Sequence, residues 1–286
     1  MDLTVPEYAY MFGFLQADGH LAQGDGQKGR LTVEVSARDI DLLREFQRLT
    51  PYNSSITRRT RSTNFAETHT SAVWRLYSLE ARTILNDLGL PYGRKSRTVA
   101  PPRGVFSGRD YLRGVVDADG SVGYTSRGFP FVSLTTASTA IGRYLCAYVE
   151  ELTGVRRTIA RNARDGIYNV LVAMEAGQRL AADLYYPGCL ALDRKQAAAD
   201  SLAGWARPAG MRSAYTARRW SPDEDRVLLQ IGSPTAAAEV LGRTPRSCNL
   251  RMWRLRAGHV PQPGERCRTR PVPSSPDPWC LTCWPR

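Results

Sequence analysis

Apolar and polar positions follow the same order twice along roughly the first 200 residues. An apolar run that ends in Asp-Gly is followed by a strand-like segment, an amphipathic helix, a second strand and a second helix. The first copy spans 11–21, 31–49 and 71–91, and the second spans 112–122, 131–152 and 167–187. Repetition of the whole succession predicts a tandem duplication of one structural unit.

The apolar runs, MFGFLQADGHL and LRGVVDADGSV, are the most similar part of the two copies. Four positions agree at an offset of 101 residues: Gly13, Ala17, Asp18 and Gly19 match Gly114, Ala118, Asp119 and Gly120. Residues four apart share one face of a helix, and small residues there let two helix backbones approach closely. We therefore expect an interface between two such helices, packed about a pseudo-two-fold axis and formed by Gly13, Ala17, Gly114 and Ala118.

This packing would bring two carboxylates together. Asp18 and Asp119 both lie at the C-terminal end of a predicted helix, where the helix dipole disfavours negative charge. Each carboxylate is also opposed by the other, so the pair requires a compensating cation. Oxygen ligands with incomplete coordination favour Mg²⁺, and the sequence therefore predicts a magnesium site at this pair.

The two motifs resemble those of the LAGLIDADG homing endonucleases in their single-chain, two-repeat form. The second motif, LRGVVDADG, is nearly complete, whereas the first, MFGFLQADG, has Gln16 in place of the first Asp. The resemblance covers about residues 6–205. It implies an α+β fold of two αββαββα repeats, over 1–102 and 103–205, whose antiparallel sheets form a saddle over double-stranded DNA.

The resemblance also implies a catalytic site. In this family the last acidic residue of each motif binds the metal, which implies a metal site of Asp18 and Asp119 with the adjoining Gly19 and Gly120. Gln16 lies outside this set. The family's lysine near the scissile phosphates corresponds to Lys95 and Lys195, which follow the two aspartates at nearly equal distances. The implied activity is a Mg²⁺-dependent, site-specific double-strand break by a monomer, promoting mobility of its own coding element.

Charge supports a nucleic-acid partner. The net charge is +12 and the pI about 9.7, which is typical of proteins that bind polyanions. Two arginine clusters, in 57–64 and 156–165, are expected to contact the DNA backbone. Their members are Arg58, Arg59, Arg61, Arg156, Arg157, Arg161 and Arg164. No apolar run is long enough to cross a membrane and no signal peptide is recognisable, so we expect a cytoplasmic protein of bacterial or phage origin.

The composition changes after Trp205. A linker over 206–218 precedes three predicted short helices over 219–258, of which the first begins at Ser221 with Glu224 in a capping-box position. The W-S-x-x-E-D and L-G-R-T-P patterns resemble the Myb/SANT-like helix-turn-helix group, without its usual central Trp. On the third helix we expect DNA contacts from Arg246, Asn249, Trp253 and Arg254.

The Pro-rich segment 259–286 is expected to be disordered. Cys280 and Cys283 have zinc-ligand spacing, but their candidate partners are irregularly placed, which favours incidental thiols over a zinc site. Two other functions remain open. One is a DNA-binding transcription regulator that keeps this scaffold without its chemistry, and the other is an RNA maturase that assists intron splicing. No splicing-type residues flank the repeats, which disfavours an intein.

Overall fold

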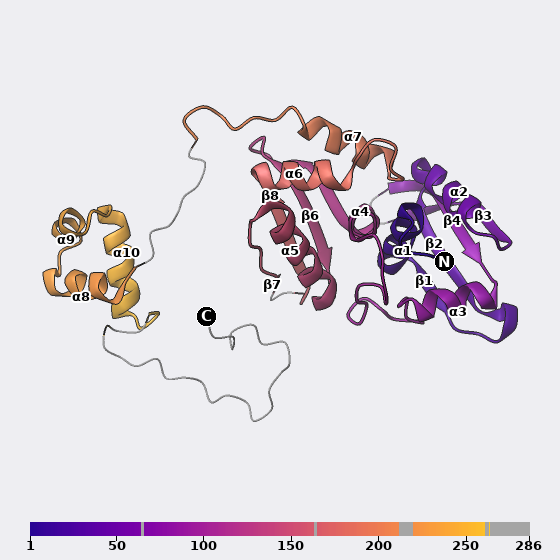
Figure 1. Ribbon diagram of the computed structural model, residues 1–286, viewed down its shortest axis with the longest axis horizontal. Helices are drawn as coiled ribbons and strands as arrows, with labels where there is room; N and C mark the ends of the chain where they lie inside the picture. Colours follow the sequence, from indigo (N-terminus) through magenta and orange to yellow (C-terminus); the bar gives the residue numbers. More distant parts are fainter. Residues whose placement is uncertain (64–65, 163–164, 212–219, 261–262, 264–286) are drawn as a thin grey trace, which may run out of the picture. The chain divides into compact units, whose positions relative to one another are not determined.

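The computed structural model describes residues 1–63, 66–162, 165–211, 220–260 and 263. The predicted Arg164, most of the predicted linker and the cysteines at 267, 280 and 283 lie outside these residues. The chain forms two compact units, Met1–Met211 and Arg212–Arg286, and each is described by itself (Figure 1). Among the described residues, no helix is long and apolar enough to span a membrane.

The first unit contains the predicted duplication. The first repeat consists of α1 (Pro6–Asp18), β1 (His20–Ala22), β2 (Arg30–Ser36), α2 (Ile40–Leu49), β3 (Ser54–Thr63), β4 (Ala66–Leu76) and α3 (Leu79–Asp87). The second consists of α4 (Gly108–Asp119), β5 (Gly120–Tyr124), β6 (Pro130–Thr136), α5 (Thr139–Thr153), β7 (Ala160–Arg161), β8 (Tyr168–Ala173) and α6 (Met174–Leu184), followed by α7 (Asp193–Leu202). The expected tandem α+β fold is therefore confirmed.

Each repeat has one four-stranded antiparallel sheet, and the two sheets have equivalent strand orders. The orders are β1-β2-β4-β3 and β5-β6-β8-β7. Helices α1 and α4 lie side by side between the sheets (Figure 1). Because α1 has neighbours on all sides, its residues 9–16 are all buried, and its apolar residues show no single face. One continuous apolar core joins the two repeats.

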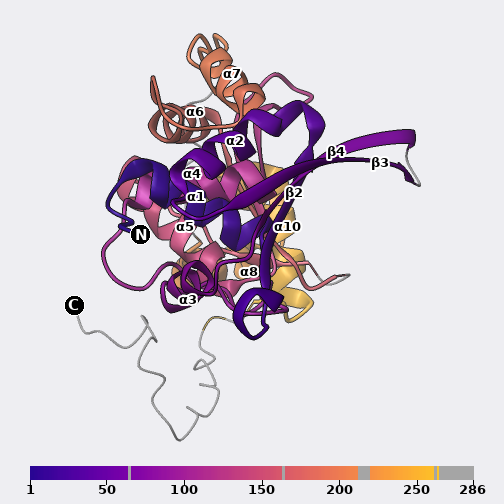
Figure 2. The ribbon, with the colours of Figure 1, turned by 90° about the vertical axis from the view of Figure 1, so that its right-hand side faces the viewer.

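One local prediction needs correction. The segment 57–64 is expected from its sequence to be a loop, but 57–63 belongs to β3, so Arg58, Arg59 and Arg61 lie on a strand. The β3–β4 ribbon extends away from the helices (Figure 2), whereas its counterpart β7 has only two residues. The two repeats thus share a topology but differ in the length of this ribbon.

The second unit is a bundle of α8 (Pro222–Ile231), α9 (Pro234–Leu241) and α10 (Pro245–Arg256). Ser221 and Glu224 form the predicted capping box at the start of α8, and Gly232 and Gly242 end α8 and α9 in the left-handed region. The small core is formed by Leu228, Ala237, Ala238, Cys248, Met252 and Leu255. Cys248 is buried in it, which removes this thiol from the candidate zinc ligands.

Candidate functional site

The site begins with the crossing of α1 and α4. A Cβ added to Gly13 would lie 2.2 Å from the carbonyl oxygen of Tyr111, and one added to Gly114 would lie 2.1 Å from that of Tyr10. No side chain fits at these distances, so glycine is required at both crossing points. Ala17 and Ala118 lie one turn further along and are half-buried. The predicted close approach of the two helices is present and is reciprocal.

Two tyrosines form hydrogen bonds between the two helices, one from each helix. Tyr10 donates a hydrogen bond to the carboxylate of Asp117, and Tyr111 donates one to the side-chain oxygen of Gln16, both at 2.6 Å. Tyr10 and Tyr111 are related by the same 101-residue offset as Gln16 and Asp117. All four residues are buried. The pseudo-two-fold axis therefore relates polar contacts in the core as well as the backbone.

Gln16 and Asp117 also hold the segments that carry the two lysines. The Gln16 amide donates to the carbonyls of Gly89 and Ala100, at 2.8 and 3.0 Å, on either side of Lys95 in the chain. The Asp117 carboxylate accepts from the Tyr185 hydroxyl at 2.6 Å and from the Leu192 N–H at 2.7 Å, shortly before Lys195. In the sequence, Gln16 is visible only as a departure from the motif. The structure shows that its amide supplies donors where Asp117 accepts.

This difference in donors and acceptors leads to a prediction with isosteric substitutions. Gln16→Glu places a carboxylate against the Gly89 and Ala100 carbonyls, whereas Asp117→Asn keeps an oxygen for the Leu192 N–H and turns its NH2 group to the Tyr185 hydroxyl, which can accept. We expect Gln16→Glu to cost about 2–4 kcal/mol of folding free energy, because buried acceptors then face one another, and Asp117→Asn to cost less. Chemical denaturation measures both costs. An unchanged midpoint for Gln16→Glu would contradict the assignment of these contacts.

Asp18 and Asp119 are the last residues of α1 and α4, and both are exposed to solvent. Within the described part of the chain neither carboxylate has a hydrogen-bond or ion-pair partner. The packed helices beneath them displace water, and this burial raises the pKa of both carboxyls. The nearby charge of Asp18 raises the pKa of Asp119 further, to about 6. The structure thus contains two mutually repelling carboxylates without a protein cation bonded to either.

This donor set fits a hard divalent cation. Carboxylate oxygens are the ligands that Mg²⁺ prefers, and Mg²⁺ commonly takes one or two carboxylates with its remaining positions left to water and substrate phosphate. The described residues contain no group of three or more His, Cys, Asp or Glu side chains placed to hold a metal. The protein's acidic contribution here is therefore the pair Asp18 and Asp119. Of the adjoining glycines, Gly120 already accepts a hydrogen bond from Lys195 through its carbonyl.

The two lysines are buried and close the C-terminal ends of the motif helices. Lys195 donates to the carbonyls of Val116, Asp117 and Gly120, at 2.6, 2.7 and 2.9 Å, which uses all three of its protons. Lys95 donates to the carbonyl of Ala17 at 2.6 Å. Burial lowers the pKa of Lys195 to about 8 and also lowers that of Lys95. These cations offset the unfavourable helix dipole beside the aspartates.

The surroundings of the two lysines differ. Lys95 lines a cavity of about 50 Å³ together with Asp119, Ser96 and Thr136, which is enough room for ordered water. Beside Lys195, the neighbouring Arg194 instead pairs with Asp39 at 3.4 Å. The two halves of the site are therefore not equivalent, although their sequences match.

The raised pKa of Asp119 predicts how metal binding depends on pH. Its value in the folded protein, about 6, exceeds the ordinary 3.8, so the folded state binds the proton more tightly. The metal-free protein should therefore lose stability as pH rises from about 4 to about 6. A divalent cation competes with that proton, and the rise in melting temperature on adding Mg²⁺ should be small at pH 5 and several-fold larger at pH 7.5. A metal response independent of pH would contradict this prediction.

The predicted DNA-contacting arginines occupy different environments in the two repeats. Arg58, Arg59 and Arg61 are exposed on β3. Arg156 is exposed just after α5, 3.9 Å from Glu150, and Arg157 is half-buried near Cys146. The backbone of Arg161 pairs with β8 in the two-residue strand β7. The two clusters therefore do not occupy equivalent places, because β7 has two residues where β3 has ten.

In the second unit, the predicted face of α10 is exposed. It contains Arg246, Asn249, Trp253 and Arg254. Trp253 is 57% exposed and lies against the His259 ring. Two further arginines of this bundle, Arg243 and Arg251, face inward instead. Arg243 pairs with Glu224 and Arg251 with Asp225, and both guanidinium groups lie over the Trp220 ring. The cations of the outer face of α10 are thus separate from those that stabilise the bundle.

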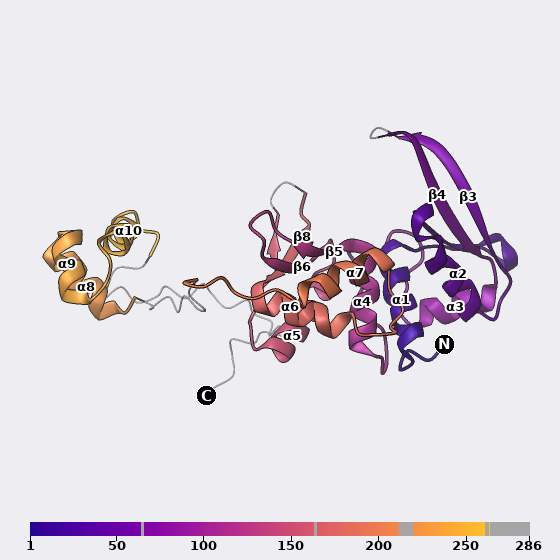
Figure 3. The same cartoon turned by 90° about the horizontal axis from the view of Figure 1, so that it is seen from above.

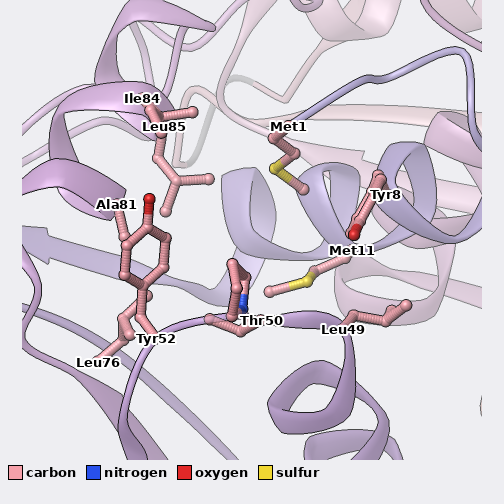
Figure 4. Close-up of a pocket in the computed structure, with 11 residues that line it drawn as sticks. Met1, Tyr8, Met11, Leu49, Thr50, Tyr52, Leu76, Ala81, Ile84 and Leu85 are labelled. Carbon is pink, nitrogen blue, oxygen red and sulfur yellow. The ribbon is translucent and has the colours of Figure 1, made fainter.

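A further pocket of the first unit contains no comparable chemistry. It has a volume of about 140 Å³ between α1, α3 and the end of α2 (Figure 4). Its lining is mainly apolar, with Met11, Leu49 and Leu85 among its residues. Met11 lies about 10 Å along α1 from Asp18, at 1.5 Å per residue. This pocket is therefore distinct from the paired carboxylates.

No protein-family model and no curated protein matches the chain. Among solved structures, the homing endonuclease I-WcaI bound to its DNA recognition sequence is similar over 70% of this chain and 88% of its own, with 10% identity and a TM-score of 0.47. Full-length DUF199/WhiA from Thermatoga maritima is similar over 89% of this chain and 92% of its own, with 11% identity and a TM-score of 0.43. A variant of I-DmoI in complex with nicked target DNA and manganese is similar over 59% of this chain and 89% of its own, with 15% identity and a TM-score of 0.39.

Proposed function

We propose that this protein is a site-specific DNA endonuclease that makes a Mg²⁺-dependent break in both strands. The observation that carries the proposal is the pair Asp18 and Asp119, two unpartnered carboxylates at the abutting ends of α1 and α4. A protein that only binds DNA gains nothing from two adjacent carboxylates to which no protein cation is bonded. Because both halves of the site come from one chain, we propose that it acts as a monomer.

Each residue of the site has a role in this proposal. Asp18 and Asp119 would hold the cation, which when bound lowers the pKa of water and stabilises the leaving oxyanion. Lys95, beside a cavity with room for water, would orient the attacking water and add positive charge near the phosphate. Lys195 is committed to three carbonyls, so we propose that it positions the end of α4 and acts on the phosphate only through its charge.

The remaining surfaces would hold the DNA. The sheet of each repeat begins next to its aspartate, since β1 and β5 start within two residues of Asp18 and Asp119. A duplex that contacts the sheets would therefore also reach the two carboxylates. The net charge of +12 predicts an affinity for DNA that falls steeply with salt. Cleavage at the locus that flanks its own reading frame would identify a homing enzyme.

Incubation of the protein with a randomised duplex library, and with the DNA that flanks its own gene, tests the proposal. A cut at a defined sequence with Mg²⁺, absent with EDTA, is the expected result. Tight duplex binding without a cut in any divalent cation would support the transcription regulator instead. Preference for structured RNA over duplex DNA would support the maturase.

We also propose that α10 is a second DNA-reading element, on the basis of its exposed Arg246, Asn249, Trp253 and Arg254. A chain ending at residue 211 keeps the first compact unit. We expect it to cleave the same site with a shorter footprint and at least about 10-fold weaker binding, because a tethered module raises the effective concentration of its partner. An unchanged footprint would exclude this role for α10.

A further inference from the structure

The faces of the two sheets that point away from the core differ in charge. In the first sheet, alternate residues of β2, β3 and β4 point toward the core, among them Leu31, Val33 and Trp74. The pairing register places the others on the outer face. Among the outer side chains that the structure describes, four are arginines and one is acidic: Arg30, Arg59, Arg61 and Arg75, with Glu34.

Two contacts confirm that these side chains share one face. Arg75 donates a hydrogen bond to Thr57 at 2.7 Å, across the β3–β4 pair. Arg61 pairs with Glu34 at 3.1 Å, across two strands. These contacts fix the orientations of long side chains on this face, which reduces the entropy lost when they bind a ligand.

The corresponding face of the second sheet carries no charge among the side chains that the structure describes. Val132, Leu134, Val170 and Val172 face the core. The outer positions in register with one another are Ser121, Phe131, Ser133, Thr135, Asn169 and Leu171. Leu171 is 50% exposed in the middle of β8, flanked by short polar residues.

The two faces also differ in extent. Strands β3 and β4 have 10 and 11 residues, and at about 3.3 Å per residue the ribbon is roughly as long as one helical turn of DNA. Strands β7 and β8 have two and six residues. Figure 3 shows the β3–β4 ribbon extending well beyond the helices that support it. A two-stranded ribbon of this kind fits the major groove.

We propose that the protein reads the two halves of its DNA target unequally. The sheet of the first repeat recognises a longer half-site that contains guanines, through the bidentate contacts that arginine makes to guanine O6 and N7. The sheet of the second repeat recognises a shorter, A·T-rich half-site, with Leu171 against thymine methyl groups and Asn169 suited to adenine. This inference rests on the proposed DNA-binding function and adds the base composition that each repeat selects.

Selection of duplexes from a randomised library by binding to the full chain in EDTA tests this inference without requiring cleavage. The expected consensus is asymmetric, with a guanine-containing half that extends further from the centre than an A·T-rich half. We expect Arg59→Ala and Arg75→Ala to weaken binding to that consensus about 10-fold and to reduce the preference for guanine in that half only. Leu171→Ser should reduce the preference for thymine in the other half only.

Arg44→Ala is the matched control, because Arg44 is an exposed arginine on α2 that pairs with Asp41 away from both faces. It should leave the consensus unchanged. Two half-sites of equal length and composition, or arginine variants that relax both halves alike, would overturn the inference while leaving the endonuclease proposal intact. An asymmetric consensus without cleavage in Mg²⁺ would support the inference and reject the nuclease. Failure to enrich any duplex would overturn both.

Discussion

Replacing Asp119 by Asn is expected to abolish cleavage of at least one DNA strand and to leave DNA binding largely intact. The same holds for Asp18→Asn. In the proposed mechanism, loss of a metal-ligand carboxylate removes several kcal/mol of transition-state stabilisation, so we expect the rate of strand cleavage to fall at least about 10³-fold. Single-turnover cleavage of a supercoiled plasmid that carries the target distinguishes nicked from linear product and therefore reports each strand separately.

The same variants, which are expected to lose activity, should gain stability. At pH 7 without metal, each Asn variant removes one of two repelling charges, and we expect the melting temperature to rise by about 1–3 °C. Its increase on adding Mg²⁺ should disappear. Asp41→Asn, on exposed α2, is the control and should change neither property. Full double-strand cleavage by Asp119→Asn would exclude this residue from the catalytic site.

Replacing Gly114 by Ala is expected to have the largest effect on folding. The added methyl would lie 2.1 Å from the Tyr10 carbonyl oxygen and 2.9 Å from the Phe14 nitrogen. Both are backbone atoms of α1, so relief requires the two helices to separate rather than a side chain to rotate. We expect a loss of about 3 kcal/mol or more, at the upper end for overpacked cores, measured by chemical denaturation.

Gly13→Ala should behave alike, since the contact is reciprocal. Gly204→Ala is the matched control, because a Cβ there meets no atom within 4 Å and its backbone requires no left-handed conformation. Equal stability of Gly114→Ala and Gly204→Ala would contradict the close crossing. Where Gly114→Ala still folds, the displaced helix ends should also weaken the stabilisation by Mg²⁺, because Asp18 and Asp119 would move apart.

Several features were predictable because they depend on spacing along the chain. Gly13 and Ala17 repeat at Gly114 and Ala118, and a helix converts a spacing of four into a shared face. The close crossing of α1 and α4 follows from that repeat. The position of the two aspartates follows as well, because each ends its helix. Tyr10 and Tyr111, which sequence reasoning did not select, repeat at the same offset and would have been found by comparing every position of the two copies.

Other features were not predictable from spacing. Gln16 differs from its counterpart Asp117 because each meets a different partner from a distant segment: two carbonyls in one repeat, and a backbone N–H and a tyrosine hydroxyl in the other. Ser36 and Asp39 have the spacing of a capping box, but α2 begins at Ile40 and Asp39 instead pairs with Arg194, which is remote in sequence. Partners of this kind become neighbours only when the chain folds.

The sequence alone therefore determined the duplication and the pairing of Asp18 with Asp119, because periodicity and repetition are properties of the chain itself, whereas the αββαββα order was implied by the resemblance of the two motifs to a known family. Tertiary structure alone decided that Lys195 is committed to helix carbonyls, that Lys95 lines a cavity, and that Arg58, Arg59 and Arg61 lie on a ten-residue strand whose counterpart β7 has two residues. The physical reason is that a side chain's hydrogen bonds, burial and charge environment are set by groups from other elements. Repeated motifs can consequently lie in unequal sites.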